Sequence, residues 1–127
     1  MSVGPAELAA AVDIDVLLSL AEAQDADEPD LVVELIDLYL ADTPRHVVAM
    51  YEALASNDQR MLARAAHALK GSSSTLGAVQ VAQSCEELER LAQALPGKAI
   101  AGFVARLEQE LATVRNVFLV ERKKRSA

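Results

Sequence analysis

Apolar residues recur every three or four positions along most of this chain, and only short breaks separate the repeats. That spacing places an apolar stripe along one side of an α-helix, which is buried when the helix packs against others. Short connections require neighbouring helices to run antiparallel. We therefore expect an all-α fold, an up-and-down antiparallel four-helix bundle with an additional short N-terminal helix as a lid. The helices are expected at residues 13–23, 30–56, 58–75, 78–94 and 98–122.

The composition agrees with a small helical bundle. The chain has 127 residues, of which 52% are hydrophobic, and it contains two Phe, two Tyr and no Trp. This is enough apolar material for one domain with a single core, and the abundant Ala and Leu favour helices over a sheet. We expect an N-terminal extension at 1–12, the bundle at 13–122 and a basic tail at 123–127. The tail is expected to complement the dipole of the last helix or to fray in solvent.

The second expected helix contains a proline. Pro44 follows Thr43 inside the segment 30–56, so the helix either kinks there or restarts with Thr43 as N-cap and Pro44 at the first helical position. No loop residues separate the two halves. We therefore predict one long kinked helix.

The helix at 58–75 presents a histidine to solvent. Asn57 is the expected N-cap, and Gly77 is the expected stop. At about 100° per residue, His67 lies about 140° away from the direction of the apolar stripe and so points outward. The stripe consists of Leu62, Ala65, Ala66, Leu69, Ser73 and Leu76. The outer face also carries Arg60, Arg64 and Ser74, with Lys70 on its flank.

Gly71 conflicts with the helix in which it is placed. A glycine inside a helix costs about 0.5–1 kcal/mol relative to alanine. In one interpretation the helix continues, and the missing side chain lets another protein approach His67 closely. In the other, the helix ends at Gly71 and the following serines form a loop. The spacing alone leaves both open.

Residues 67–73 have the sequence His-Ala-Leu-Lys-Gly-Ser-Ser. Together with Leu-Gly-Ala at 76–78, Cys-Glu-Glu-Leu-Glu at 85–89 and the stretch 35–44, this motif resembles the signature of histidine-containing phosphotransfer (HPt) domains. The resemblance extends over about 13–120. It implies a helical bundle that displays one histidine, which accepts a phosphoryl group from an aspartate of one receiver domain and passes it to another. It also favours the continuous helix through Gly71.

Imidazole chemistry suits that role. A neutral ring nitrogen is available at cellular pH, so His67 is the expected phosphoacceptor. Phosphoryl transfer requires positioning and charge neutralisation more than covalent machinery. Lys70 is expected to neutralise part of the phosphoryl charge. Arg64 is a second candidate, with a solvated surface charge as its other interpretation.

Two further residues are expected near the histidine. Ser72 either bonds back to its own helix or orders the imidazole. By the family resemblance, Glu89 occupies a place where some members have a glutamine that orients the histidine. A carboxylate accepts the same hydrogen bond but adds negative charge beside a phosphoryl group, so this role of Glu89 is left open.

The charges are divided unevenly along the chain. Residues 1–58 carry 13 acidic and one basic side chain, and residues 59–127 carry 6 acidic and 11 basic ones. The resemblance implies receiver domains as partners, each with an acidic pocket that holds Mg²⁺. A basic surface around His67 would steer that encounter. The other interpretation is that the acidic half only keeps the domain soluble.

Other kinds of site have little support. His46 and His67 with a single cysteine do not have the spacing of metal ligands, so we expect no metal and no cofactor in this chain. Cys85 falls on an apolar stripe and is expected in the core. The segment 71–74 lacks the Gly-Lys-Ser/Thr ending of a phosphate-binding loop. The acidic total disfavours nucleic acid as a partner.

We therefore expect a phosphorelay carrier without a kinase domain, which works between an upstream histidine kinase or hybrid kinase and a response regulator. The alternative is a binding module that docks a receiver or kinase without carrying phosphate. The chain can also be one domain of a hybrid kinase. No signal peptide and no membrane span are apparent, so we expect a cytoplasmic protein. We also expect it to be a monomer.

Overall fold

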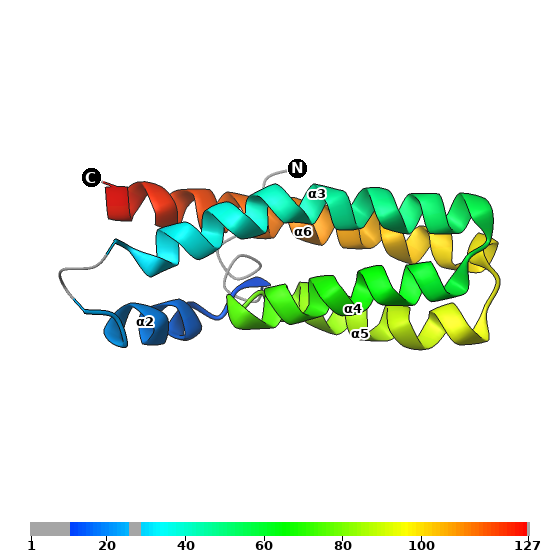
Figure 1. Ribbon diagram of the computed structural model, residues 1–127, viewed down its shortest axis with the longest axis horizontal. Coiled ribbons are helices and arrows are strands. Elements are labelled where there is room, and N and C mark those ends of the chain that lie inside the picture. Colours follow the sequence, from blue (N-terminus) through cyan, green and yellow to red (C-terminus); the bar gives the residue numbers. More distant parts are fainter. Residues whose placement is uncertain (1–10, 26–28, 127) are drawn as a thin grey trace.

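The computed structural model describes residues 11–25 and 29–126. Within them the only regular elements are helices, so the predicted fold class is confirmed. Four helices run up and down and pack as a bundle in the order α3, α4, α5, α6, with α6 returning beside α3 (Figure 1). The elements are α2 (Ile14–Glu22), α3 (Leu31–Ser56), α4 (Gln59–Thr75), α5 (Val79–Ala94) and α6 (Gly97–Ser126).

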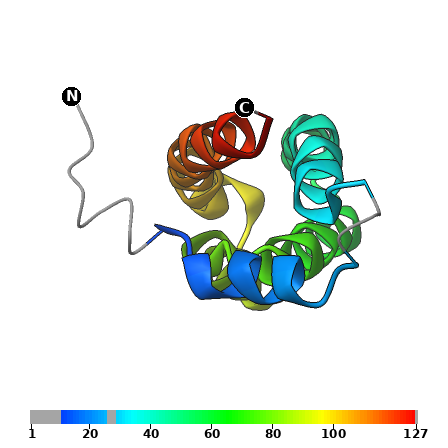
Figure 2. The ribbon, with the colours of Figure 1, turned by 90° about the vertical axis from the view of Figure 1, so that its left-hand side faces the viewer.

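The short helix α2 completes one end of the bundle. With 26 residues, α3 extends over about 39 Å, whereas the 17 residues of α4 extend over about 26 Å. The long helices α3 and α6 therefore project beyond α4 and α5, and α2 lies against this projecting part (Figures 1 and 2). Leu17 of α2 is buried there. The predicted lid helix thus covers apolar surface that α4 and α5 do not reach.

Gly77 permits the contact that holds the segment before α2. Its φ of +76° lies in the left-handed region, and its carbonyl accepts a hydrogen bond of 2.7 Å from the backbone N–H of Asp13. A Cβ at this position would lie 2.6 Å from the carbonyl oxygen of Asp13. The predicted stop of α4 is therefore confirmed, and it also leaves room for the neighbouring chain segment.

Helix α3 continues through Pro44, as predicted. Because proline has no backbone N–H, the carbonyl of Leu40 loses its usual donor. The hydroxyl of Thr43 donates to the carbonyl of Tyr39 in the same turn. The alternative, a restart of the helix at Thr43, is wrong, because the helix has no break there.

The predicted N-cap of α4 is wrong by one residue. Asn57 has a φ of +55° and ends α3, where its N–H donates to the carbonyls of the last turn. Asp58 caps α4 instead, and its carboxylate accepts a hydrogen bond of 3.0 Å from the N–H of Met61. An asparagine tolerates the left-handed conformation that this tight connection requires, which leaves the capping of α4 to the aspartate.

A polar contact between α3 and α4 lies in the core. Tyr39 is buried edge-on against Phe118 with 5.4 Å between ring centroids, and its hydroxyl lies 2.8 Å from Oγ of the buried Ser73. Burial raises the pKa of Tyr39 to about 12, so the hydroxyl stays protonated. The prediction that Ser73 belongs to the buried stripe is confirmed, and the hydrogen bond satisfies its hydroxyl.

Helix α6 extends beyond its predicted end at Arg122, through the segment that we expected as a tail. Arg122 pairs with Asp37 of α3 at 2.6 Å, and Arg125 pairs with Asp30, the N-cap of α3, at 3.2 Å. At the other end, Ala11 and Val12 of the expected extension are buried in the core, and residues 1–10 lie outside the described residues. The extent of the domain remains a prediction.

Candidate functional site

His67 projects from the middle of α4, and its side chain is 71% exposed. The apolar stripe that contains Leu62, Ala66 and Leu69 is fully buried on the opposite side of the helix. Burying this stripe fixes the rotation of α4 and therefore turns the histidine to solvent. The outward direction inferred from the spacing is the one observed.

Glu89 of α5 lies beside the imidazole. Its Oε1 and Oε2 atoms are 3.1 and 3.2 Å from Nδ1 of His67, and Oε1 is 3.3 Å from Nζ of Lys70. Lys70 follows His67 by three residues, so both side chains reach the same carboxylate from one face of α4. We call these three residues the His67 cluster. It forms where α4 and α5 pack along their length.

The cluster selects one tautomer of the neutral ring. A carboxylate only accepts hydrogen bonds, so Nδ1 of His67 carries the hydrogen that it donates to Glu89. The lone pair of a neutral imidazole then resides on Nε2. No group in residues 11–25 and 29–126 bonds to Nε2. The exposed nitrogen is therefore the nucleophilic one.

Gly71 lies one turn after His67 on the exposed side of an unbroken helix. No atom lies within 4 Å of the place that its Cβ would occupy. The continuous-helix interpretation is confirmed, and the interpretation of 71–74 as a loop is wrong. The buried contact of Ser73 with Tyr39 holds the segment after Gly71 against α3. Thr75 adds a hydrogen bond of 3.0 Å to the carbonyl of Gly71.

Within the part of the chain that the structure describes, no hydrogen bond or ion pair joins the remaining predicted site residues to the cluster. Ser72 donates back to the carbonyl of Leu69 at 3.2 Å, which is the first of the two roles considered for it. Arg60, Arg64 and Ser74 are exposed on α4. In the described part of the chain, none of them forms an ion pair or hydrogen bond with His67, Lys70 or Glu89.

The pairing of Lys70 with Glu89 is the feature that sequence reasoning missed. The sequence predicts both residues at the site but gives no sign that they pair with each other. The spacing of Lys70 from His67 indicates a shared helix face. The position of Glu89 depends on the register of α5 against α4, for which the sequence carries no local signal.

The structure does not support a reactive thiol at Cys85 or a metal site among the described residues. Cys85 is buried, and burial together with the charges of Glu110 and Glu89 raises the pKa of its thiol to about 12. A thiol this weakly acidic is a poor nucleophile. No group of three or more His, Cys, Asp or Glu side chains gathers at a metal-binding distance among the described residues. None of the described helices combines the length and apolarity that crossing a membrane requires.

Comparison with known proteins gives a consistent result. The sequence model of the Hpt domain family matches residues 34–117. Histidine-containing phosphotransfer protein B (HptB) from Pseudomonas aeruginosa PAO1 is 33% identical, with a TM-score of 0.80 over 90% of this chain and 96% of HptB. No curated protein matches the chain.

Two more distant structures share the fold. The HPT domain of the Hpt sensor hybrid histidine kinase from Shewanella is 24% identical, with a TM-score of 0.74 over 92% of this chain and 97% of that domain. The histidine-containing phosphotransfer protein ZmHP2 from maize is 22% identical, with a TM-score of 0.79 over 96% of this chain and 98% of ZmHP2.

With the matched family model and the HptB likeness, the exposed histidine and its cluster place this chain in the Hpt domain family, whose role is phosphotransfer in two-component signalling.

Proposed function

We propose that this protein is a phosphoryl carrier that accepts a phosphoryl group on Nε2 of His67 and passes it to a response regulator. The donor in this proposal is the aspartyl phosphate of a receiver domain or a histidine kinase. The observation that carries the proposal is the hydrogen bond from Nδ1 to Glu89, because it leaves the exposed Nε2 as the nucleophile. The cytoplasm is the proposed location, because there the carrier meets both partners.

The transfer step follows from this geometry. The Nε2 lone pair of His67 attacks the phosphorus of the aspartyl phosphate, an N–P bond forms, and the P–O bond to the aspartate breaks. The aspartate leaves as a carboxylate. The Nδ1 hydrogen stays in its bond to Glu89 throughout. Attack of a second aspartate on the phosphohistidine reverses the bond changes and releases the neutral ring. The Mg²⁺ that assists both steps belongs to the receiver domain.

Lys70 and Glu89 have complementary roles in this proposal. The carboxylate of Glu89 orients His67, but its negative charge opposes an incoming phosphoryl group. The ammonium of Lys70 lies 3.3 Å from that carboxylate and offsets its charge. Because Lys70 stands one turn from His67, the same ammonium also lowers the cost of placing a phosphoryl dianion on Nε2.

The outer face of α4 is the proposed docking surface for the receiver. Gly71 leaves open space beside His67, so the rim of an acidic pocket can approach the imidazole. Arg60 and Arg64 precede His67 on this face and supply positive charge for the encounter. Ser74 lies after Gly71 as a small polar contact. Ser72 supports the helix through its backward hydrogen bond.

A direct test uses phosphoramidate, a small donor that phosphorylates histidine without a partner protein. We expect phosphate that is labile in acid and stable in alkali, with a ³¹P NMR signal of the Nε2 isomer. His67→Gln removes the acceptor from an exposed position, so the variant should stay folded and remain unlabelled. A protein that binds a phosphorylated receiver but takes no label from either donor would instead be the non-phosphorylated binding module.

A further inference from the structure

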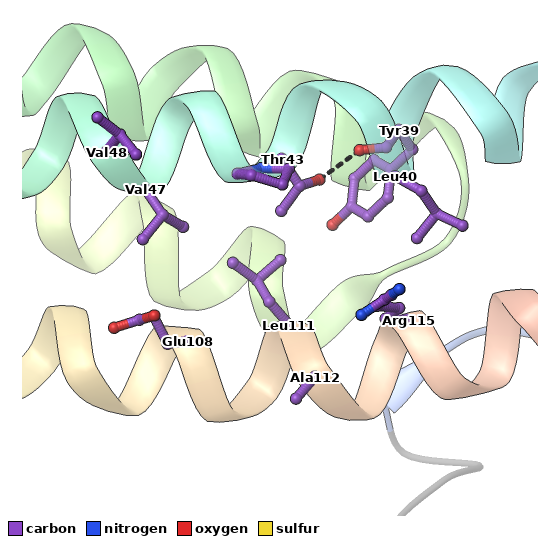
Figure 3. Close-up of a pocket in the computed structure, with 10 residues that line it drawn as sticks. Tyr39, Leu40, Thr43, Val47, Val48, Glu108, Leu111, Ala112 and Arg115 are labelled. Carbon is purple, nitrogen blue, oxygen red and sulfur yellow. Dashed lines mark hydrogen bonds between the residues drawn. The ribbon is translucent and has the colours of Figure 1, made fainter.

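A groove of about 560 Å³ lies between α3 and α6 (Figure 3). Its walls are mainly apolar, and Val47 of α3 and Leu111 of α6 point toward each other across it. Because α3 and α6 form the side of the bundle opposite α4 and α5, the groove faces away from His67 (Figures 1 and 2). The phosphotransfer site therefore does not account for it.

Two opposite charges on α6 mark the groove. Glu108 and Arg115 both line it, and they are seven residues apart, which is about 10.5 Å along the helix. The hydroxyl of Tyr51 donates to Glu108 and holds its carboxylate at the groove. Arg115 is exposed and has no ion pair within residues 11–25 and 29–126. Leu111 and Ala112 occupy the midpoint between the two charges.

This arrangement is self-complementary. If a second α6 packs antiparallel across the midpoint, Glu108 faces the partner's Arg115, and Arg115 faces the partner's Glu108. A two-fold interface uses one patch twice and needs such pairing of each residue with its counterpart.

We propose that the α3–α6 groove binds a second copy of this chain, with the two α6 helices antiparallel. From the sequence we expect a monomer. The pairing across the groove depends on how α3 and α6 pack, and the sequence alone does not reveal that packing. The two His67 side chains of such a dimer remain exposed on its outer faces. This proposal does not rest on the phosphotransfer function, so each can fail without the other.

Charge reversal with mixing provides the test. Analytical ultracentrifugation over a concentration series should show a dimer for the wild type. Glu108→Arg and Arg115→Glu each place like charges opposite one another, so each variant alone should have a dissociation constant raised roughly tenfold or more. An equimolar mixture of the two variants restores both opposite-charge pairs and should recover the dimer. The double variant Glu108→Arg with Arg115→Glu should recover it as well.

Arg106→Glu is the matched control. Arg106 lies on the side of α6 toward α5, where it is 3.9 Å from Glu87, and its reversal should leave the dimer unchanged. A wild type that is monomeric at every concentration overturns the proposal. A dimer that neither single reversal weakens, or that the mixture fails to restore, also overturns it. Phosphoramidate labelling of His67 should be the same in every variant.

Discussion

Glu89 holds the ring of His67 from a neighbouring helix, with its two carboxylate oxygens 3.1 and 3.2 Å from Nδ1. The two residues are 22 positions apart in the chain, and only the packing of α4 against α5 brings them together. The contact places the hydrogen of the neutral ring on Nδ1 and leaves the lone pair on Nε2. It also gives the exposed histidine a defined orientation without burying it.

Glu89→Gln and Glu89→Ala separate the hydrogen bond from the charge. The amide oxygen of glutamine still accepts from Nδ1, so Gln should accept phosphate at least as fast as the wild type. Ala loses the acceptor, and phosphorylation should slow by about tenfold, the size expected for one hydrogen bond of about 1.4 kcal/mol. Rates of labelling by phosphoramidate measure both. Equal rates for Ala and the wild type would show that Glu89 does not position the ring.

Lys70→Ala should slow phosphate acceptance while leaving the fold almost unchanged. The variant leaves Glu89 as an uncompensated negative charge beside the incoming phosphoryl group. The free energy of unfolding should change by less than about 0.5 kcal/mol, because a partly exposed ion pair contributes little. Lys98→Ala, at an exposed position on α6, is the control for loss of charge. If both variants label at the wild-type rate, Lys70 is only a surface charge.

Gly71→Ala should stabilise the protein by up to about 1 kcal/mol, because the helix continues through this position and the new Cβ meets no neighbour. Gly102→Ala is the matched control, since that helical glycine also has open space around it. The two should raise the thermal midpoint by a similar amount.

Gly71→Gln tests the docking surface beside the histidine. Labelling by the small donor phosphoramidate should be normal, whereas transfer from a phosphorylated receiver should fall. The same change at Gly102 should affect neither. Full-speed transfer from the receiver to the Gly71→Gln variant would contradict the proposed clearance.

Gly77→Ala should have the opposite effect on stability from Gly71→Ala. Its backbone is left-handed, and the new Cβ would meet the carbonyl oxygen of Asp13 at 2.6 Å. We expect a loss of roughly 1–3 kcal/mol, measured by chemical denaturation. An unchanged midpoint would mean that the segment before α2 adjusts without cost.

The sequence by itself determined the five helices and the outward direction of His67. Both depend on the phase of apolar residues along one helix, which is local information. The sequence also predicts that the helix continues through Pro44 and that a helix stops at Gly77. Both predictions depend on residues within a few positions: no loop residues flank Pro44, and glycine readily adopts the left-handed conformation.

Tertiary packing decided what depends on distant residues. Helix α4 continues past Gly71, and Ser73 in its last turn forms a hydrogen bond with Tyr39, 34 positions away. Helix α6 continues past Arg122, and Arg125 in its last turn forms an ion pair with Asp30. The partner of Lys70 and the charged α3–α6 groove likewise depend on the register between helices. Apolar periodicity specifies which face of a helix is buried. It does not specify the axial position of the helix relative to its neighbour. That register is set when all side chains of the core pack together.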